Sequence, residues 1–345
     1  MLPRERVFAA LNFSRPDIVP LECHPSPAGL FEHGERVKDL WKRHPQDFGD
    51  LSDAPLPEID PKWMDTEGRY CELRRDEWGV LWKHLIFGVH GHPIERPLDD
   101  WSNLARFRVP AAPGCLGESF RIEQARAREH QRHHFLKSGW ISIFEVMHAV
   151  RRFEDVLMDI QSGSPEIHRL ADLITEYQSD CVHYLLERGV DAIQFGDDFG
   201  TQNGLMFSRE RWRQFFKPRY ERLIRPIRAA GKNVFFHSCG NVHDLLDEFA
   251  DLGVDALWLQ LPLYDERDLA EWGRRHRIAL ALQADRSHLM TYGTAADVRR
   301  AVEGMVGTFS VQSGGVWFYV EIDNGFPLEN VVALFEAISQ FRTLR

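Results

Sequence analysis

The sequence predicts a single (β/α)8 barrel (TIM barrel), in which parallel strands alternate with helices. A helical pattern follows each of six apolar, strand-like runs, which end near Phe144, Phe195, Phe236, Leu259, Leu282 and Val320. Two earlier strands are expected at residues 16–23 and 47–51, which brings the count to eight. The length of 345 residues suits such a barrel as one unit, so we expect one domain over residues 1–345.

The strand at residues 47–51 is the weakest element of this prediction, because it is short and carries little apolar character. Without it, a seven-stranded or open doubly wound sheet is the competing architecture. Residues 60–97 are aromatic, rich in β-formers and punctuated by turns, which predicts a β-hairpin excursion packed on the barrel. The remaining early elements are a helical segment at residues 3–12, a helical stretch at 28–43, a loop at 110–117 and a charged helix at 118–137.

Composition and charge exclude several classes of protein. Hydrophobic residues make up 43% of the chain, and no run approaches the roughly 20 apolar residues that span a bilayer. The net charge of -10, without a basic aromatic stripe, argues against a nucleic-acid partner. Five scattered cysteines without a CxxC pair, and an N-terminus without a secretory signal, predict a cytoplasmic protein. The aromatic excursion is compatible with a homodimer, although no residue pattern specifies one.

The stretch NVFFHSCGN, residues 233–241, presents an imidazole and a thiol at the end of a predicted strand. Alternate residues of a strand point to the same face, so His237 and Cys239 would aim their donor atoms at one point. These two residues are candidate metal ligands. Taken alone, the pair is equally well explained as a hydrogen-bonded core histidine beside a small buried cysteine.

Polar residues recur at the ends of the other predicted strands, where barrels carry their active sites. Any one of them is more often a solvated or capping residue, but their recurrence on one face favours a pocket. They are Glu22, His24, Glu145, His148, Asp197, Asp198, Gln260, Gln283, Asp285, Glu321 and Asp323.

Two adjacent carboxylates, Asp197 and Asp198, form the second constellation. Neighbouring residues of a strand point to opposite faces, so we expect one carboxylate to enter the site and the other to bind backbone amides. The one in the site could act as a general base or hold a substrate group. As a third zinc ligand we predict Glu321, because it ends the last barrel strand on the same face. A mixed N, S and O set with an open position is typical of a catalytic zinc.

Several longer segments resemble the uroporphyrinogen decarboxylase superfamily. They are RERVFAALNFSRPDIVP, FGDDFGTQNGL, FSRERWRQFFKPRYERLIRPIRAAGKNVFFHSCGNVHDLL and FPLENVVALFEAI, and together they cover most of the chain. The superfamily is built on a (β/α)8 barrel, in agreement with the strand count. The arginine-rich segment with which true uroporphyrinogen decarboxylases bind substrate carboxylates is replaced here by HPSPAGLFEHGER.

The resemblance is closest to the branch of zinc-dependent methyltransferases that act with corrinoid proteins and bind zinc through a His-x-Cys pair and a later Cys. His237 and Cys239 match the pair, and Glu321 stands where the later Cys is expected. A glutamate leaves zinc a stronger Lewis acid than a thiolate does. The resemblance therefore implies Zn2+ held by His237, Cys239 and Glu321, and transfer of a methyl group from a methoxylated or methylated small molecule to or from a corrinoid (cobalamin) on a partner protein.

Roles for the remaining residues follow from this hypothesis. Asp197 or Asp198 and Gln202 would contact the substrate, and the pocket wall would contain Glu22, His24, Glu145, His148, Gln260 and Gln283. Trp78, Trp82, Phe87 and His90 in the excursion would either form a lid or partner surface or, as aromatic residues more often do, pack the excursion on the barrel. Two alternatives stay open: a metal-free decarboxylase of a small aromatic or tetrapyrrole acid, and a non-catalytic barrel that binds corrinoid or another ligand.

Overall fold

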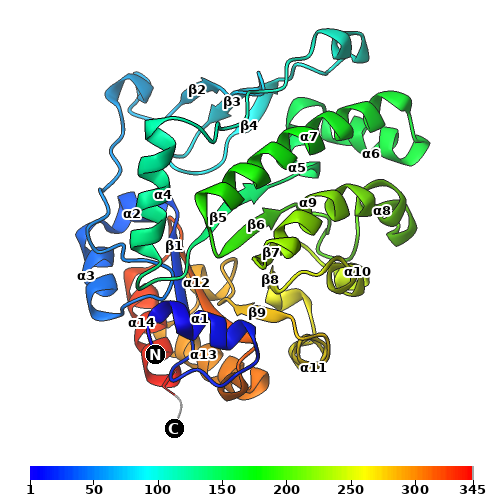
Figure 1. Cartoon of the computed structure of the whole chain (residues 1–345). Coiled ribbons are helices and arrows are strands. Elements are labelled where there is room, and N and C mark those ends of the chain that lie inside the picture. Colours follow the sequence, from blue (N-terminus) through cyan, green and yellow to red (C-terminus); the bar gives the residue numbers. More distant parts are fainter. Residues whose placement is uncertain (344–345) are drawn as a thin grey trace.

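Seven parallel strands form a curled, barrel-like sheet surrounded by helices in the computed structural model, which describes residues 1–343 (Figure 1). The strand order is β1-β10-β9-β8-β7-β6-β5, so each strand lies beside its neighbour in the chain except where β1 pairs with β10. The predicted α/β barrel is therefore confirmed, with seven strands rather than eight. The strands are β1 (Leu21–Pro25), β5 (Lys137–Ile141), β6 (Ala192–Gly196), β7 (Asn233–Ser238), β8 (Ala256–Leu259), β9 (Ala279–Leu282) and β10 (Val316–Ile322).

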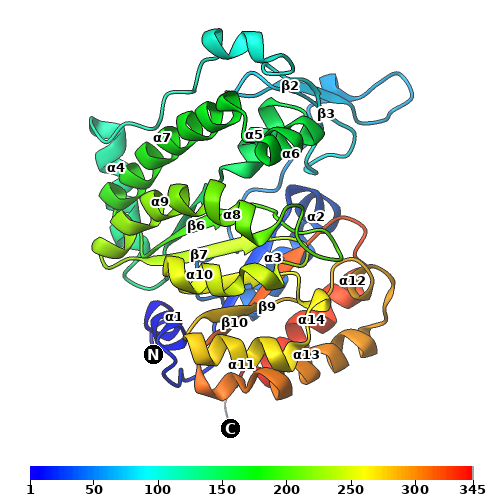
Figure 2. The ribbon, with the colours of Figure 1, turned by 90° about the vertical axis from the view of Figure 1, so that its right-hand side faces the viewer.

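Helices cover the outer face of this sheet, and their ends follow local sequence signals (Figure 2). The long helix α7 begins after Ser164, whose side chain accepts from the amide of Ile167, and ends at Gly189 in the left-handed region. The predicted helix at residues 28–43 is broken in two at Gly34, where φ is 55°. The helices are α1 (Pro3–Leu11), α2 (Pro27–His33), α3 (Glu35–Arg43), α4 (Glu118–His130), α5 (Phe144–Val150), α6 (Phe153–Ser162), α7 (Pro165–Arg188), α8 (Arg209–Phe215), α9 (Lys217–Ala229), α10 (Leu246–Leu252), α11 (Glu266–His276), α12 (Leu289–Tyr292), α13 (Ala295–Phe309) and α14 (Leu328–Phe341). Within residues 1–343, none of these helices combines the length and apolar character needed to cross a bilayer.

The expected strand at residues 47–51 is not formed, and a short irregular segment occupies its place between β1 and β5. The amide of Asp47 donates to the carbonyl of Leu21 in β1, and the carbonyl of Asp47 accepts from the amide of Phe135 just before β5. Side chains supply the other acceptors: Asp47 Oδ2 accepts from the Leu21 amide and Gln46 Oε1 from the Cys23 amide, both at 2.7 Å. Two residues thus bridge the gap that a strand would otherwise fill, so the barrel closes without an eighth strand.

Two arginines compensate the buried charge of Asp47, which is 1% exposed. Arg342 Nη2 lies 2.7 Å from Asp47 Oδ2, and Arg6 from α1 pairs with Oδ1. Residues from early and late in the described chain therefore meet at this carboxylate. We call Gln46, Asp47, Arg6 and Arg342 the seam cluster.

The predicted excursion is confirmed as a separate antiparallel sheet, with three strands rather than two. These are β2 (Glu72–Arg75), β3 (Leu81–His84) and β4 (His92–Glu95). In both views this sheet lies at the end of the barrel opposite α1 and the N-terminus (Figures 1 and 2). The loop between β3 and β4 touches α2, because a Cβ at Gly88 would lie 2.4 Å from the amide nitrogen of Ala28. The excursion is therefore seated on the barrel.

Glu248 links three helices on the outer face. Its carboxylate on α10 is 0% exposed and pairs with Arg209 and Arg213 of α8 at 2.7 and 2.6 Å. Lys217 of α9 completes the set at 2.8 Å. Burial alone would raise the pKa of Glu248, but hydrogen bonds from the three cationic side chains lower it to about 2.

Because the pKa of Glu248 lies below its ordinary value of 4.5, this group stabilises the fold above pH 4.5, and the stabilisation is lost as the pH falls towards 2. The upper limit is about 3 kcal/mol, and we expect about 1–2 kcal/mol because the cationic partners are partly exposed. Urea unfolding should show Glu248→Gln destabilised at pH 7 and the difference from wild type shrinking at pH 3. Asp251→Asn, which removes an exposed partner of Lys217, is the control. An equal difference at both pH values would contradict the ion-pair account.

Candidate metal site and adjoining cavities

His237 and Cys239 lie at the carboxyl end of β7, where the chain turns sharply. The turn needs Gly240, which has φ 75° and packs so closely that a Cβ there would lie 2.1 Å from the carbonyl oxygen of Gly200. Nε2 of His237 lies 3.3 Å from Sγ of Cys239. The two donor atoms face the same point, on the face of the barrel that holds the strand ends.

Asp198 provides a third donor from the loop after β6. Its Oδ1 lies 3.6 Å from Nε2 of His237 and accepts from the amide of Cys239 at 2.7 Å. The donor atoms of Asp198, His237 and Cys239 all lie within 4.8 Å of one another. Ligand atoms on a tetrahedral zinc lie about 3.3–3.6 Å apart. The two separations that involve Nε2 of His237, 3.3 and 3.6 Å, lie in this range, and the donor types are those that zinc binds.

The hydrogen bonds of His237 select the tautomer that a metal requires. Nδ1 lies 3.0 Å from the carbonyl oxygen of Trp258, to which it donates, so Nε2 keeps its lone pair facing Cys239. Burial lowers the pKa of His237, which favours the neutral imidazole. Burial, and then the charge of Asp198, raise the pKa of the Cys239 thiol to about 12. The thiol thus keeps its proton unless a cation binds beside it.

Glu321 lies near this group but is not one of its three members. Its Oε2 accepts from Gln283 at 2.9 Å and pairs with Nη1 of Arg286 at 2.9 Å. Burial raises the pKa of Glu321 to about 7. The assignment of Glu321 as a zinc ligand stays a prediction, and the structure adds Asp198 as an oxygen donor that the sequence did not single out for the metal.

Asp197 points away from the site and is 0% exposed. Its carboxylate accepts from the amides of Ile143 and Glu145, each at 2.7 Å, and from the hydroxyl of Tyr220. Burial raises its pKa to about 7. Of the two adjacent carboxylates, Asp198 therefore faces the site, whereas Asp197 holds the turn between β5 and α5.

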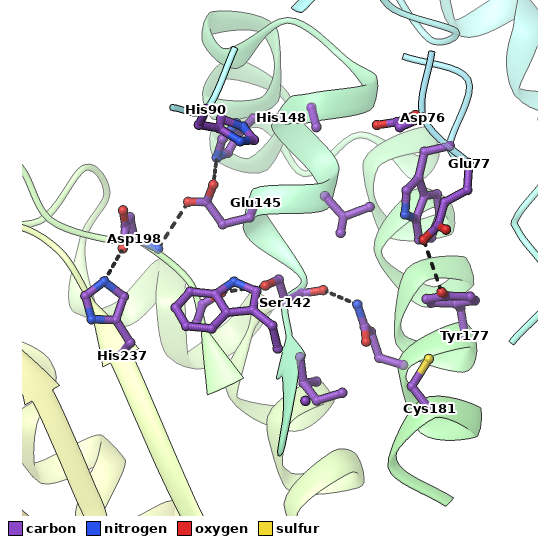
Figure 3. A pocket seen from close by; sticks show the side chains of 18 of the residues that line it. Asp76, Glu77, His90, Ser142, Glu145, His148, Tyr177, Cys181, Asp198 and His237 are labelled. Atoms are coloured by element: carbon purple, nitrogen blue, oxygen red, sulfur yellow. Dashed lines mark hydrogen bonds and ion pairs between the residues drawn. The ribbon is translucent and has the colours of Figure 1, made fainter. Parts of the chain in front are cut away.

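That turn brings Glu145 and His148 to the wall of a cavity of about 600 Å³ next to Asp198 and His237 (Figure 3). Nε2 of His148 lies 3.2 Å from Oε2 of Glu145. Burial alone would lower the pKa of His148, but the hydrogen bond and charge of Glu145 raise it. We call this space the aromatic cavity, since Trp78, Trp82, Trp140, Tyr177 and Tyr184 line it.

Trp140 reaches the aromatic cavity because β5 carries an irregularity. The pairing of β5 with β6 shifts between Ser138 and Ile141, and Gly139 has φ 89°. The indole of Trp140 packs on Gly196, where a Cβ would lie 2.2 Å from it, and its centroid is 5.6 Å from that of His237. We did not predict Trp140 from the sequence, although a glycine within a strand is a known sign of a bulge.

A second cavity of about 460 Å³ borders the same metal-ligand candidates. His237 lines both cavities, whereas Cys239, Gln260, Gln283 and Arg286 line only the second. The loop between β3 and β4 contributes to both, with His90 in the aromatic cavity and Val89 in the second. We call the second space the polar cavity.

The other predicted residues differ in whether they reach a cavity. Glu22 is buried in the barrel interior, where it pairs with Lys137 at 2.7 Å and accepts from Trp317. His24 and Gln202 are exposed and line neither cavity. Trp78, Trp82 and His90 of the excursion line the aromatic cavity, whereas Phe87 packs on Phe31 and Tyr70.

The fold and site define a barrel protein with a candidate three-donor metal site at the carboxyl ends of its strands. The chain belongs to the uroporphyrinogen decarboxylase family, whose model matches residues 94–341. A methyltransferase from Methanosarcina mazei has a similar structure, with a TM-score of 0.64, 16% sequence identity and 99% of each chain covered. A B12-independent methionine synthase from Shewanella sp. W3-18-1 gives a TM-score of 0.48 and 10% identity over 95% of this chain and 94% of that one. None of the curated sequences compared matches this chain. The likeness to the Methanosarcina mazei methyltransferase shows a shared fold.

Proposed function

We propose that this protein is a zinc-dependent methyltransferase that demethylates a methoxylated or methylated small molecule, with a corrinoid on a partner protein as the methyl acceptor. The observation that carries the proposal is the convergence of Asp198, His237 and Cys239 beside two cavities. Membership of the family and the likeness in fold to a methyltransferase support it.

In this proposal His237, Cys239 and Asp198 hold the zinc, and Glu321 is the alternative oxygen ligand. A bound zinc would supply Lewis acidity at the heteroatom that carries the methyl group. The hydrogen bond from His237 to Trp258 fixes the orientation of the imidazole before any ion arrives. The Cys239 amide fixes Asp198 in the same way.

The demethylated heteroatom keeps the electron pair of the broken bond to carbon and therefore needs a proton. We assign its delivery to the Glu145–His148 pair, in which Nε2 of His148 lies 3.2 Å from Oε2 of Glu145 and holds the proton that the Glu145 carboxylate passes on. Asp197 acts as a positioning residue, because it binds the backbone amide of Glu145. The donor would enter from the aromatic cavity, which leaves the polar cavity as a second approach to His237.

A decarboxylase is the second candidate, and one observation favours it. Arg286 lines the polar cavity, where a guanidinium could bind a substrate carboxylate. However, Arg286 already pairs with Asp323 at 2.5 Å and with Glu321, so a substrate would have to displace these acids.

A methyl-transfer assay tests the proposal. Purified protein is expected to contain about one zinc per chain and to convert cob(I)alamin to methylcobalamin with a member of a panel of methoxylated and methylated compounds, as followed by absorbance. Chelation of zinc should abolish the transfer, and added zinc should restore it. Carbon dioxide release from a carboxylic acid by zinc-free protein would favour the decarboxylase instead. Zinc binding without turnover on any donor would favour a non-catalytic barrel.

A further inference from the structure

The aromatic cavity is lined by both aromatic rings and acidic side chains. Four carboxylates line it, on Asp76, Glu77, Glu145 and Asp198. Among residues 1–343, neither a lysine nor an arginine belongs to its lining, and His148, whose pKa is raised, is already paired with Glu145. The polar cavity differs, because Arg286 lines it. A negatively charged ligand would therefore meet acids in the aromatic cavity without a counter-charge from Lys or Arg.

Three of these carboxylates already have strong partners. Asp76 accepts from Nε1 of Trp82 at 2.7 Å and from the Val80 amide at 2.9 Å. Glu145 pairs with His148, and Asp198 accepts from the Cys239 amide. Within residues 1–343, the Glu77 carboxylate accepts one hydrogen bond, from the Tyr177 hydroxyl at 3.5 Å, and this bond is long. Glu77 thus retains most of its capacity to accept hydrogen bonds from a ligand.

Glu77 lies at the end of the cavity remote from the metal-ligand candidates. Figure 3 shows Glu77 and Tyr177 on one side and Asp198 and His237 on the other. The rings of Trp78 and Tyr177 meet there edge to face, with centroids 5.0 Å apart at 74°, and Phe107 stacks behind Trp78. Aromatic rings beside a carboxylate that accepts only a long hydrogen bond are the elements with which proteins bind organic ammonium groups.

We propose that the aromatic cavity selects methyl donors that carry a positive charge at the end remote from the methyl group. The ammonium group binds between Glu77 and the rings of Trp78 and Tyr177, and the methyl-bearing heteroatom lies near His237. The proposal rests on the proposed function for the identity of the reacting end, whereas the charge selection rests on the cavity lining. A volume of about 600 Å³ lies within the range of small-molecule sites and suits a donor with a single ring.

Three ligands that differ in one substituent test this selection. They are 3-methoxytyramine, with an ammonium group, 4-ethyl-2-methoxyphenol, which is neutral, and homovanillate, with a carboxylate. Calorimetric titration of the zinc-loaded protein should find the ammonium ligand about three- to tenfold tighter than the neutral one. The carboxylate ligand should bind more weakly than the neutral one. Equal or tighter binding of homovanillate would overturn the proposal.

A substitution locates the selection at Glu77. Glu77 is exposed, and Glu77→Gln is expected to remove most of the preference for 3-methoxytyramine while changing binding of the neutral ligand less than twofold. The matched control is Glu67→Gln, an exposed acid of the same excursion that pairs with Arg69 and lines neither cavity. An unchanged preference in Glu77→Gln would contradict the assignment to this residue.

Binding and turnover separate this proposal from the function on which it rests. Preference for the ammonium ligand without methyl transfer to cob(I)alamin would leave the charge selection standing and defeat the methyltransferase. Methyl transfer with a preference for homovanillate would support the methyltransferase and overturn the charge selection.

Discussion

The Asp198→Asn protein is expected to bind zinc more than about 100-fold more weakly than wild type, whereas Glu321→Gln should lose less than tenfold. Asparagine keeps an oxygen that can accept from the Cys239 amide, so the loop can stay in place while the ligand charge is lost. Loss of a residue that merely supports a ligand costs about 10- to 100-fold, and loss of a ligand costs more. Competition with a chromogenic chelator measures both affinities.

Glu321→Gln is the matched control because glutamine keeps a side-chain oxygen that can accept from Gln283. If Glu321→Gln lost more zinc affinity than Asp198→Asn, Glu321 would be the oxygen ligand and Asp198 a residue that positions Cys239. His237→Ala and Cys239→Ala should lose zinc in either case. Stoichiometric zinc in both would remove the metal site altogether.

Asp47→Ala is expected to lower the free energy of unfolding by about 3–5 kcal/mol, because it leaves Arg342 and Arg6 of the seam cluster without their buried counter-charge. The substitution also removes the acceptor for the Leu21 amide. Urea unfolding followed by circular dichroism measures the change. Asp17→Ala removes an exposed partner of Arg6 and should cost less than about 1 kcal/mol. A similarly small effect of Asp47→Ala would show that the seam cluster does not hold the barrel closed.

The sequence predicts the barrel well because β6, β7, β8, β9 and β10 are buried on almost every residue and therefore appear as apolar runs. The sequence does not predict how the seam cluster closes the gap between β1 and β5. Gln46 and Asp47 take the place of a strand with side-chain acceptors, and hydrogen bonds of this kind leave no periodic pattern of apolar residues. Buried Asp47 and Arg342 are almost 300 residues apart in the chain, so only the fold brings them together.

The part of the candidate metal site that β7 itself positions was predictable from the sequence. His237 and Cys239 follow from the alternation of side chains along β7. Asp198 as a third donor depends on the path of the loop after β6, which the Cys239 amide and the close approach of Gly200 to Gly240 determine. The lining residues of α7, such as Tyr177, appear in the sequence as ordinary positions of a long helix.

The bulge that directs Trp140 into the aromatic cavity lies in β5, the last strand on its side of the sheet. A change in an inner strand would disturb hydrogen bonds with two neighbours, whereas a change in β5 disturbs its ladder with β6 alone. Insertions and deletions beside Gly139 therefore disturb fewer backbone hydrogen bonds than equivalent changes in β7, which carries His237. In evolutionary terms, the shape of the aromatic cavity can diverge at β5 while the metal-ligand candidates are inherited unchanged.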